Sequence, residues 1–141
     1  MRTSVIYNSH SGTTKALATE IGKFLAEKGI ENKIGSIDSY DRDYLQSADL
    51  VMLGCWTSGL MIIAQQPDRP WKYFAKRMPP INDKPVAFFT TYKLATGSMF
   101  RRMEKTLNGK ISKPVAFIRS KSRSLSDENR AVLERLAAEM T

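Results

Sequence analysis

A loop rich in hydroxyl side chains near the start of the chain holds the residues best suited to bind a charged group. It follows an apolar run at residues 5–7, which predicts a buried strand, and precedes apolar residues at helical spacing from 17 to 25. At a helix start the first backbone N–H groups lack acceptors within the helix, and the helix dipole is positive. The arrangement predicts a phosphate site, the alternative being hydroxyl groups that only cap the helix. The hydroxyl residues are Ser9, Ser11, Thr13 and Thr14.

Two further segments predict buried strands that end in polar turns. Residues 48–55 and 85–91 are mostly apolar, and residues 56–59 and 92–97 follow them as turns. In an α/β sheet the carboxyl ends of parallel strands meet at one edge, and ligands bind there. We therefore expect the three turns to contribute to a single site.

The remaining segments complete an alternation of strands and helices. This order predicts an α/β fold, in which a parallel sheet carries helices on both faces, in one domain spanning residues 1–141. The other expected elements are strands at 31–37 and 114–118, helices at 41–46, 71–78, 98–107 and from 126 onward, and a loop at 64–70.

The counts of cysteine and histidine exclude several classes of site. The single cysteine, Cys55, excludes an intramolecular disulfide, and one histidine, His10, is too few for a His/Cys metal cluster.

No apolar run approaches the roughly 18 residues of a membrane span, and no signal-peptide pattern opens the sequence. We expect a soluble cytoplasmic protein without a membrane span.

Three phosphate chemistries that α/β sheets support do not match the residues at the strand ends. A response regulator requires acidic residues after the first strand, where this chain has Asn8. A low-molecular-weight phosphatase requires an arginine six residues after its cysteine, a position that Met61 occupies relative to Cys55. The Walker pattern of a nucleotide-binding loop is absent. Cys55 is thus expected to be a buried strand-end residue, and His10 an exposed or backbone-bonded loop residue.

Positive charge is concentrated in the second half of the chain. Residues 1–70 hold 7 Lys/Arg and 8 Asp/Glu, a net charge of −1, whereas residues 71–141 hold 15 and 6, a net charge of +9. A one-sided basic surface favours acidic partners, nucleic acid or an anionic membrane, and the alternative is a solvated surface. Because no zinc-finger spacing or RNA-binding aromatic motif accompanies the charge, no nucleic-acid partner is expected.

The three turns resemble the cofactor loops of the flavodoxin family. The segment Ser9-His10-Ser11-Gly12-Thr13-Thr14 is similar to the family's phosphate loop, S/T-x-S/T-G-x-T. Residues 54–59 (GCWTSG) resemble the second flavin loop, and residues 91–97 (TYKLATG) resemble the third. The resemblance covers almost the full chain. It implies a flavodoxin-like, doubly wound, five-stranded sheet of order 2-1-3-4-5, with FMN as the cofactor.

The resemblance also implies a role for each loop. The first loop holds the FMN phosphate through N–H and hydroxyl donors, the Ser58–Gly59 peptide faces flavin N5, and the third loop meets the pyrimidine edge. The flavin carries the redox chemistry, and no catalytic side chain or metal ligand is implied. The implied cofactor-binding residues are Ser9, His10, Ser11, Gly12, Thr13, Thr14, Trp56, Thr57, Ser58, Gly59, Thr91, Tyr92, Lys93, Leu94 and Gly97.

The chain departs from the family pattern at three points. Leu94 stands where many members place an aromatic residue on the outer face of the ring. Trp56 lies two residues before the usual tryptophan position, so it either stacks on the flavin or belongs to the core. The charge is basic, whereas most members are acidic.

These features together imply a one-electron carrier between redox partner proteins. The positive charge predicts that those partners present acidic docking surfaces. Two alternatives stay open: a small FMN-dependent NAD(P)H or quinone reductase, and a cofactor-free module that binds an acidic partner.

Overall fold

The main sheet has five parallel strands in the order β2-β1-β3-β6-β7, and a separate hairpin pairs β4 with β5. The computed structural model describes residues 1–60, 63–93 and 95–140. Counted along the chain, the strands of the main sheet stand in the order 2-1-3-4-5, so the predicted flavodoxin-like topology is confirmed. These strands are β1 (Arg2–Asn8), β2 (Glu31–Ser36), β3 (Leu50–Trp56), β6 (Val86–Thr91) and β7 (Ala116–Ser120).

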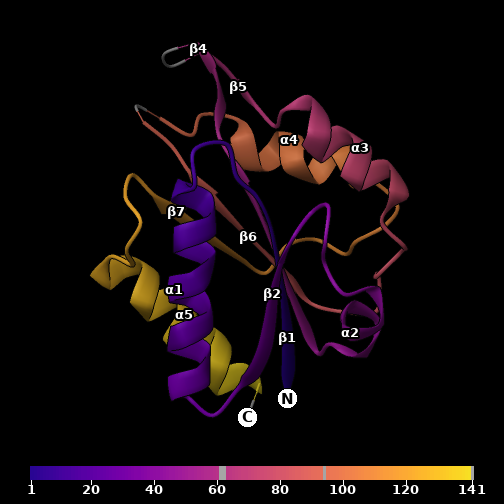
Figure 1. Ribbon diagram of the computed structural model, residues 1–141, viewed down its shortest axis with the longest axis vertical. Helices are drawn as coiled ribbons and strands as arrows, with labels where there is room; N and C mark the ends of the chain where they lie inside the picture. The colour runs from indigo at the N-terminus through magenta and orange to yellow at the C-terminus, as the bar shows by residue number, and fades with distance from the viewer. Residues whose placement is uncertain (61–62, 94, 141) are drawn as a thin grey trace.

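Helices cover both faces of the sheet, as the alternation of elements predicts (Figure 1). One face packs against α1 (Thr13–Glu27) and α5 (Asp127–Met140). The other face packs against α2 (Arg42–Ser47), α3 (Arg69–Arg77) and α4 (Met99–Thr106). Successive residues of a strand point to opposite faces, so each inner strand supplies both cores. None of the helices among the described residues is long and apolar enough to cross a membrane.

The position of a strand in the sheet explains its sequence pattern. All six residues of β6, in the interior of the sheet, are buried, and in β3 only Trp56 is partly exposed. Such strands read as continuous apolar runs because helices cover both of their faces. The edge strand β7 instead alternates buried and exposed residues, and Phe117 is 41% exposed.

Four segments differ from the prediction. The expected turn at 56–59 is shorter, because Trp56 ends β3 and Ser58 begins β4. The expected loop at 64–70 is wrong, because Ile63–Gln66 forms β5 and pairs antiparallel with β4 (Ser58–Leu60). These two strands have four and three residues, too few to show an alternating pattern. Helix α3 begins at Arg69, before Pro70, because a proline without an N–H fits the first helical turn. The last strand begins at Ala116 instead of residue 114.

Candidate cofactor-binding site

A cleft of about 440 Å³ lies at the carboxyl end of the central strands. This volume falls within the ~300–1,000 Å³ typical of small-molecule sites. Residues from all three predicted turns line the cleft, together with residues from β5 and from the segment after β7. The lining residues are His10, Ser11, Thr13, Trp56, Thr57, Gln65, Thr91, Tyr92, Lys93, Ala95 and Lys121.

The turn between β1 and α1 presents backbone donors to this end of the sheet. Gly12 has a φ of 91°, a left-handed conformation that glycine adopts without strain, and it turns the chain into α1. The Ser9 hydroxyl accepts hydrogen bonds from the N–H groups of Gly12 (3.0 Å) and Lys15 (3.3 Å). Within the described part of the chain, the N–H groups of Thr13 and Thr14 have no acceptor. These donors remain available for an anion.

The four hydroxyl residues of this turn fall into two pairs. Ser11 and Thr13 line the cleft, and their hydroxyl oxygens lie 3.3 Å apart. Thr14 is only 1% exposed, and its hydroxyl oxygen lies 2.6 Å from that of Thr91. The Ser9 hydroxyl already accepts hydrogen bonds from backbone N–H groups of its own turn. Ser11 and Thr13 therefore offer side chains to a ligand, whereas Ser9 and Thr14 support the turn from behind.

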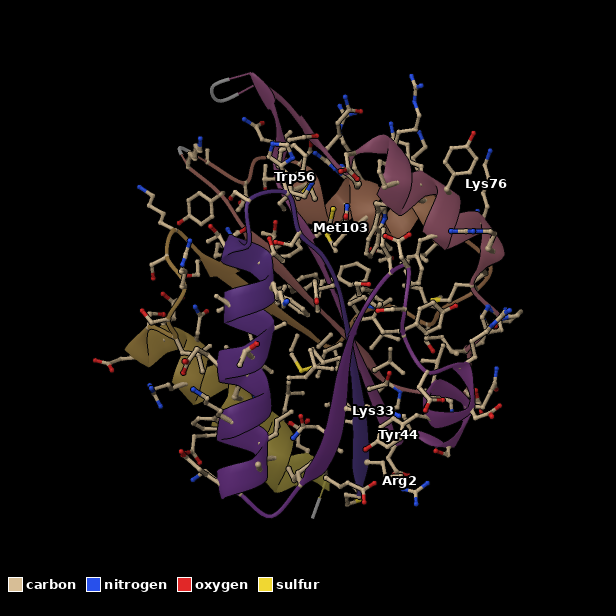
Figure 2. The ribbon with its side chains drawn as sticks, viewed as in Figure 1. Arg2, Lys33, Tyr44, Trp56, Lys76 and Met103 are labelled. Carbon is tan, nitrogen blue, oxygen red and sulfur yellow. The ribbon has the colours of Figure 1, made fainter. Side chains whose placement is uncertain are left out.

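Trp56 lies at this end of the sheet, beside the β1–α1 turn (Figure 2). Its indole stacks on the exposed ring of His10, with centroids 4.5 Å apart and planes 23° apart. The same indole packs against the core under α3 and α4. Trp56 thus belongs to the core, as one of the two alternatives predicts, and it also lines the cleft.

Asp68 holds three elements together behind the cleft, and sequence reasoning missed it. One carboxylate oxygen accepts hydrogen bonds from the side-chain amide of Asn8 (2.6 Å) and from the N–H of Trp71 (3.1 Å). The other oxygen accepts the indole N–H of Trp56 at 2.8 Å. Asp68 therefore caps α3 and joins it to the ends of β1 and β3. The pair Asp68–Pro70 is a helix-start signal, but nothing local points to the bonds with Asn8 and Trp56.

Cys55 is a buried strand-end residue, as predicted. It has no exposed surface, and the amide of Asn8 lies 3.4 Å from its sulfur. Burial raises the pKa of the Cys55 thiol to about 12, although the hydrogen bond from Asn8 opposes the shift. A protonated and inaccessible thiol is not a nucleophile.

The third turn and the segment after β7 bring two cations to the cleft. Lys93 and Lys121 line it, and no carboxylate is among the lining residues of the described chain. The ammonium group of Lys121 lies 5.7 Å from the centre of the Tyr92 ring, within the range of a cation–π contact. This end of the sheet therefore attracts anions.

The other predicted site residues lie near the cleft without lining it. The Ser58 hydroxyl donates to the carbonyl of Gln66 (2.5 Å) within the hairpin, and Gly59 belongs to β4. Gly97 has a φ of 50°, and a Cβ there would come within 2.5 Å of the Gln65 side chain, so β5 packs against this turn. Leu94 lies outside the described residues.

Three residues of the lining were not predicted from the sequence. Lys121 follows the last strand of the main sheet, so the rule that ligands bind at carboxyl ends of strands could have identified it. Ala95 lies inside the predicted third turn but carries no functional group. Gln65 reaches the cleft only through the hairpin, which has no signal in the sequence.

Comparisons with known proteins define the class of protein. The family model for the flavodoxin domain matches residues 4–120. The flavodoxin of Clostridium beijerinckii is 27% identical over 105 residues, which cover 74% of this chain and 75% of that protein. The chain therefore belongs to the flavodoxin family, whose members bind FMN and transfer electrons to redox partner proteins.

Solved structures support the same fold. The two-electron reduced flavodoxin of Megasphaera elsdenii superposes with a TM-score of 0.72 at 19% identity, over 97% of this chain and 98% of that one. Oxidised flavodoxin 2 of Bacillus cereus gives a TM-score of 0.70 at 17% identity, over 100% of both chains. At these identities the likeness concerns the arrangement of strands and helices.

Proposed function

We propose that this protein is an FMN-binding carrier of single electrons and that the cleft holds its flavin. The observation that carries the proposal is the group of unpaired N–H donors at the start of α1, beside two hydroxyls and at the edge where the strands end. A phosphate dianion fits such donors, because N–H groups and a helix dipole offset negative charge without a lysine inside the loop.

The residues of the cleft suit the rest of FMN. Ser11 and Thr13 supply hydroxyl donors to the phosphate, while Trp56 and Tyr92 offer aromatic surface to the ring. Lys93 and Lys121 offset the negative charge that reduction adds. Bound FMN would supply one-electron redox chemistry, and the chain orients the cofactor and sets its potential.

The partners in this proposal are redox proteins with acidic docking surfaces. The sequence contains 22 Lys/Arg and 14 Asp/Glu, which gives a net charge of +8. Opposite charge on a partner steers the encounter and raises the association rate, most strongly at low salt.

Binding of FMN and of riboflavin, which lacks the phosphate, tests the proposal. FMN should bind much more tightly than riboflavin. The double variant Ser11→Ala, Thr13→Ala should lose about 1–3 kcal/mol of FMN binding free energy, because charge-assisted hydrogen bonds to the phosphate are lost. Thr19→Ala is the matched control, since its hydroxyl bonds the Lys15 carbonyl on the exposed side of α1. Fluorescence titration measures all affinities, and equal affinities for FMN and riboflavin would overturn the assignment.

Oxidation of NAD(P)H separates a carrier from a reductase. The FMN-loaded protein alone should not oxidise NADH or NADPH steadily in the presence of a quinone. Continuous turnover, followed at the absorbance of the nicotinamide, would assign the protein to the reductases instead.

A further inference from the structure

A partly exposed apolar cluster lies where α4 meets the edge strand β7. Val115 is 51% exposed, Phe117 is 41% exposed, and Phe100 is partly buried beside them. The ring of Phe117 lies 4.9 Å from that of Phe100 and 6.2 Å from that of Phe88, between centroids. Phe117 belongs to the edge strand β7 and Val115 directly precedes it, and both side chains keep a large exposed part. Grouped apolar side chains that remain exposed mark interaction surfaces.

One cation packs on this cluster, and others lie on the adjoining helix α4. The guanidinium of Arg119 lies 5.3 Å from the centre of the Phe100 ring, so one cation packs directly on the apolar cluster. An apolar centre with a charged rim is the usual composition of a protein–protein interface. We call this region the α4–β7 surface; it consists of the cluster Phe100, Val115 and Phe117 with Arg119, the exposed cations Arg101, Arg102 and Lys105 of α4, and Lys113 before β7. Helix α4 also carries one acidic residue, Glu104.

The excess positive charge of the whole protein comes from this side of the sheet. Residues 68–113, which include α3 and α4, hold 11 Lys/Arg and 3 Asp/Glu, a net charge of +8. The rest of the chain holds 11 of each and is neutral. This distribution locates most of the charge of residues 71–141 before residue 114, since residues 114–141, which include α5, hold 5 Lys/Arg and 4 Asp/Glu, a net charge of only +1.

Among the described residues, no cation of this segment forms an ion pair with a carboxylate. Four ion pairs occur among the described residues, and all of them involve lysine or arginine residues before residue 34. The exposed cations Arg101, Arg102 and Lys105 of α4 therefore keep their charge available to an external carboxylate.

We infer that the α4–β7 surface docks an acidic protein that places an apolar side chain over Val115 and Phe117. The inference rests on the proposed electron-carrier function and assigns it a docking site. A second copy of this chain would bring like charges together, which disfavours self-association through this surface. A nucleic acid would meet the cations but leave the aliphatic Val115 without a complementary apolar group.

The α4–β7 surface also adjoins the cleft. The Arg119 guanidinium donates to the Thr96 hydroxyl at 3.3 Å, and Thr96 belongs to the third turn. Two residues after Arg119, Lys121 lines the cleft itself. A partner docked here therefore lies beside the turn that adjoins the flavin in the proposed complex.

Charge reversal on one face tests the location of the docking site. The readout is the second-order rate of electron transfer from the reduced, FMN-loaded protein to an acidic cytochrome in low salt. The test variant carries R101E, R102E and K105E. The control variant has the same net charge but carries K23E, R130E and R135E on α1 and α5, on the opposite face of the sheet.

We expect the test variant to react about tenfold more slowly than the parent, because local charge complementarity governs steering. The rate of the control variant should fall by less than about threefold, since only the charge far from the docking site changes. Equal losses in the two variants, or a larger loss in the control, would overturn the inference.

Removal of the apolar centre tests the second part of the inference. The double variant V115Q and F117Q should weaken the complex with the acidic cytochrome about tenfold at ~150 mM salt, where charge effects are screened. The control is Y73Q, because Tyr73 is 60% exposed and lies on α3, outside the surface. An unchanged dissociation constant in V115Q and F117Q would overturn the apolar contact.

The outcomes separate failure of this inference from failure of the proposed function. The absorbance spectrum of bound FMN is recorded for every variant before a partner is added, so loss of cofactor is detected independently. Normal FMN binding with equal rates in the two charge variants would reject only the docking site. Tight binding of an oligonucleotide at ~150 mM salt, lost in the R101E, R102E and K105E variant, would assign the surface to nucleic acid.

Discussion

The two ends of the main sheet use their polar groups in different ways. At the amino end, Arg2 pairs with Glu31 at 2.9 Å and Lys33 pairs with Asp41 at 2.6 Å. Both cations also lie over the ring of Tyr44, at 5.8 and 5.9 Å from its centroid, and Figure 2 shows the three residues together. The charged side chains named here are therefore paired with one another within the protein.

The carboxyl end keeps several polar groups unpaired. Lys93 and Lys121 line the cleft without a carboxylate among its described lining residues, and two N–H groups at the start of α1 lack acceptors in the described chain. Folding alone would favour pairing these groups, as at the amino end. The comparison favours the carboxyl end as the FMN site of the proposed function.

The largest expected difference between the two ends is in stability, and it is tested by replacing two aspartates that cap helices. Asp68→Ala should lower the free energy of unfolding by about 2–4 kcal/mol, because it removes a helix cap, leaves the indole N–H of Trp56 without its acceptor and leaves the Asn8 amide with only the Cys55 sulfur. Asp41→Ala should cost less, because the Asp41 carboxylate caps α2 and pairs with Lys33 at the surface. Urea unfolding of both variants measures the difference. Equal losses would show that the network around Asp68 adds nothing beyond the cap.

The buried thiol at the carboxyl end should make the protein less stable in alkali. The pKa of Cys55 is about 12 when folded and 9.0 ordinarily, so the unfolded chain loses this proton first as the pH rises. The stabilisation is complete below pH 9 and is lost between about pH 9 and 12, with about 1 kcal/mol lost by pH 10. Urea unfolding at pH 7 and 10 should show a smaller pH effect in Cys55→Ala than in the parent.

Tyr44 provides the corresponding control at the amino end. Desolvation and a hydrogen bond to Glu31 raise its pKa from 10.0 to about 12. Its contribution to alkaline destabilisation therefore begins about one pH unit higher than that of Cys55. If Tyr44→Phe removes the effect at pH 10 and Cys55→Ala does not, the assignment to the thiol is wrong.

Charge at the carboxyl end should also change the reduction potential of bound FMN. A unit charge ~10 Å away, at an effective dielectric constant of 20–80, contributes roughly 0.4–1.7 kcal/mol. This energy corresponds to about 20–70 mV for one electron. Lys93→Glu should make the second one-electron potential more negative, and by more than Arg102→Glu does, because only Lys93 lines the cleft.

Lys33→Glu at the amino end is the distant control for this measurement, and its potential should match that of the parent. Spectroelectrochemical titration at low and high salt measures all three variants, and the shift should shrink as salt screens the charge. A Lys93→Glu variant with the parent's potential at low ionic strength would contradict the prediction.

The main sheet and the position of the cleft follow from local sequence patterns. The apolar runs that became β1, β3 and β6 are continuous because these strands are buried on both faces. Gly12, among hydroxyl residues after the first run, marks the turn into α1. Because parallel strands separated by helices end at the same edge, the three turns had to converge.

Contacts between distant segments settled the remaining features. Asp68 bonds to Asn8, sixty residues away, and the hairpin of β4 and β5 brings Gln65 to the cleft. The grouping of cations on the face that carries α3 and α4 likewise depends on which helices cover which side of the sheet. Local sequence patterns indicate which residues are buried and the period at which buried residues recur along the chain. They carry no information about which partners a polar side chain meets once the chain has folded, because those partners come from elements far apart in the sequence.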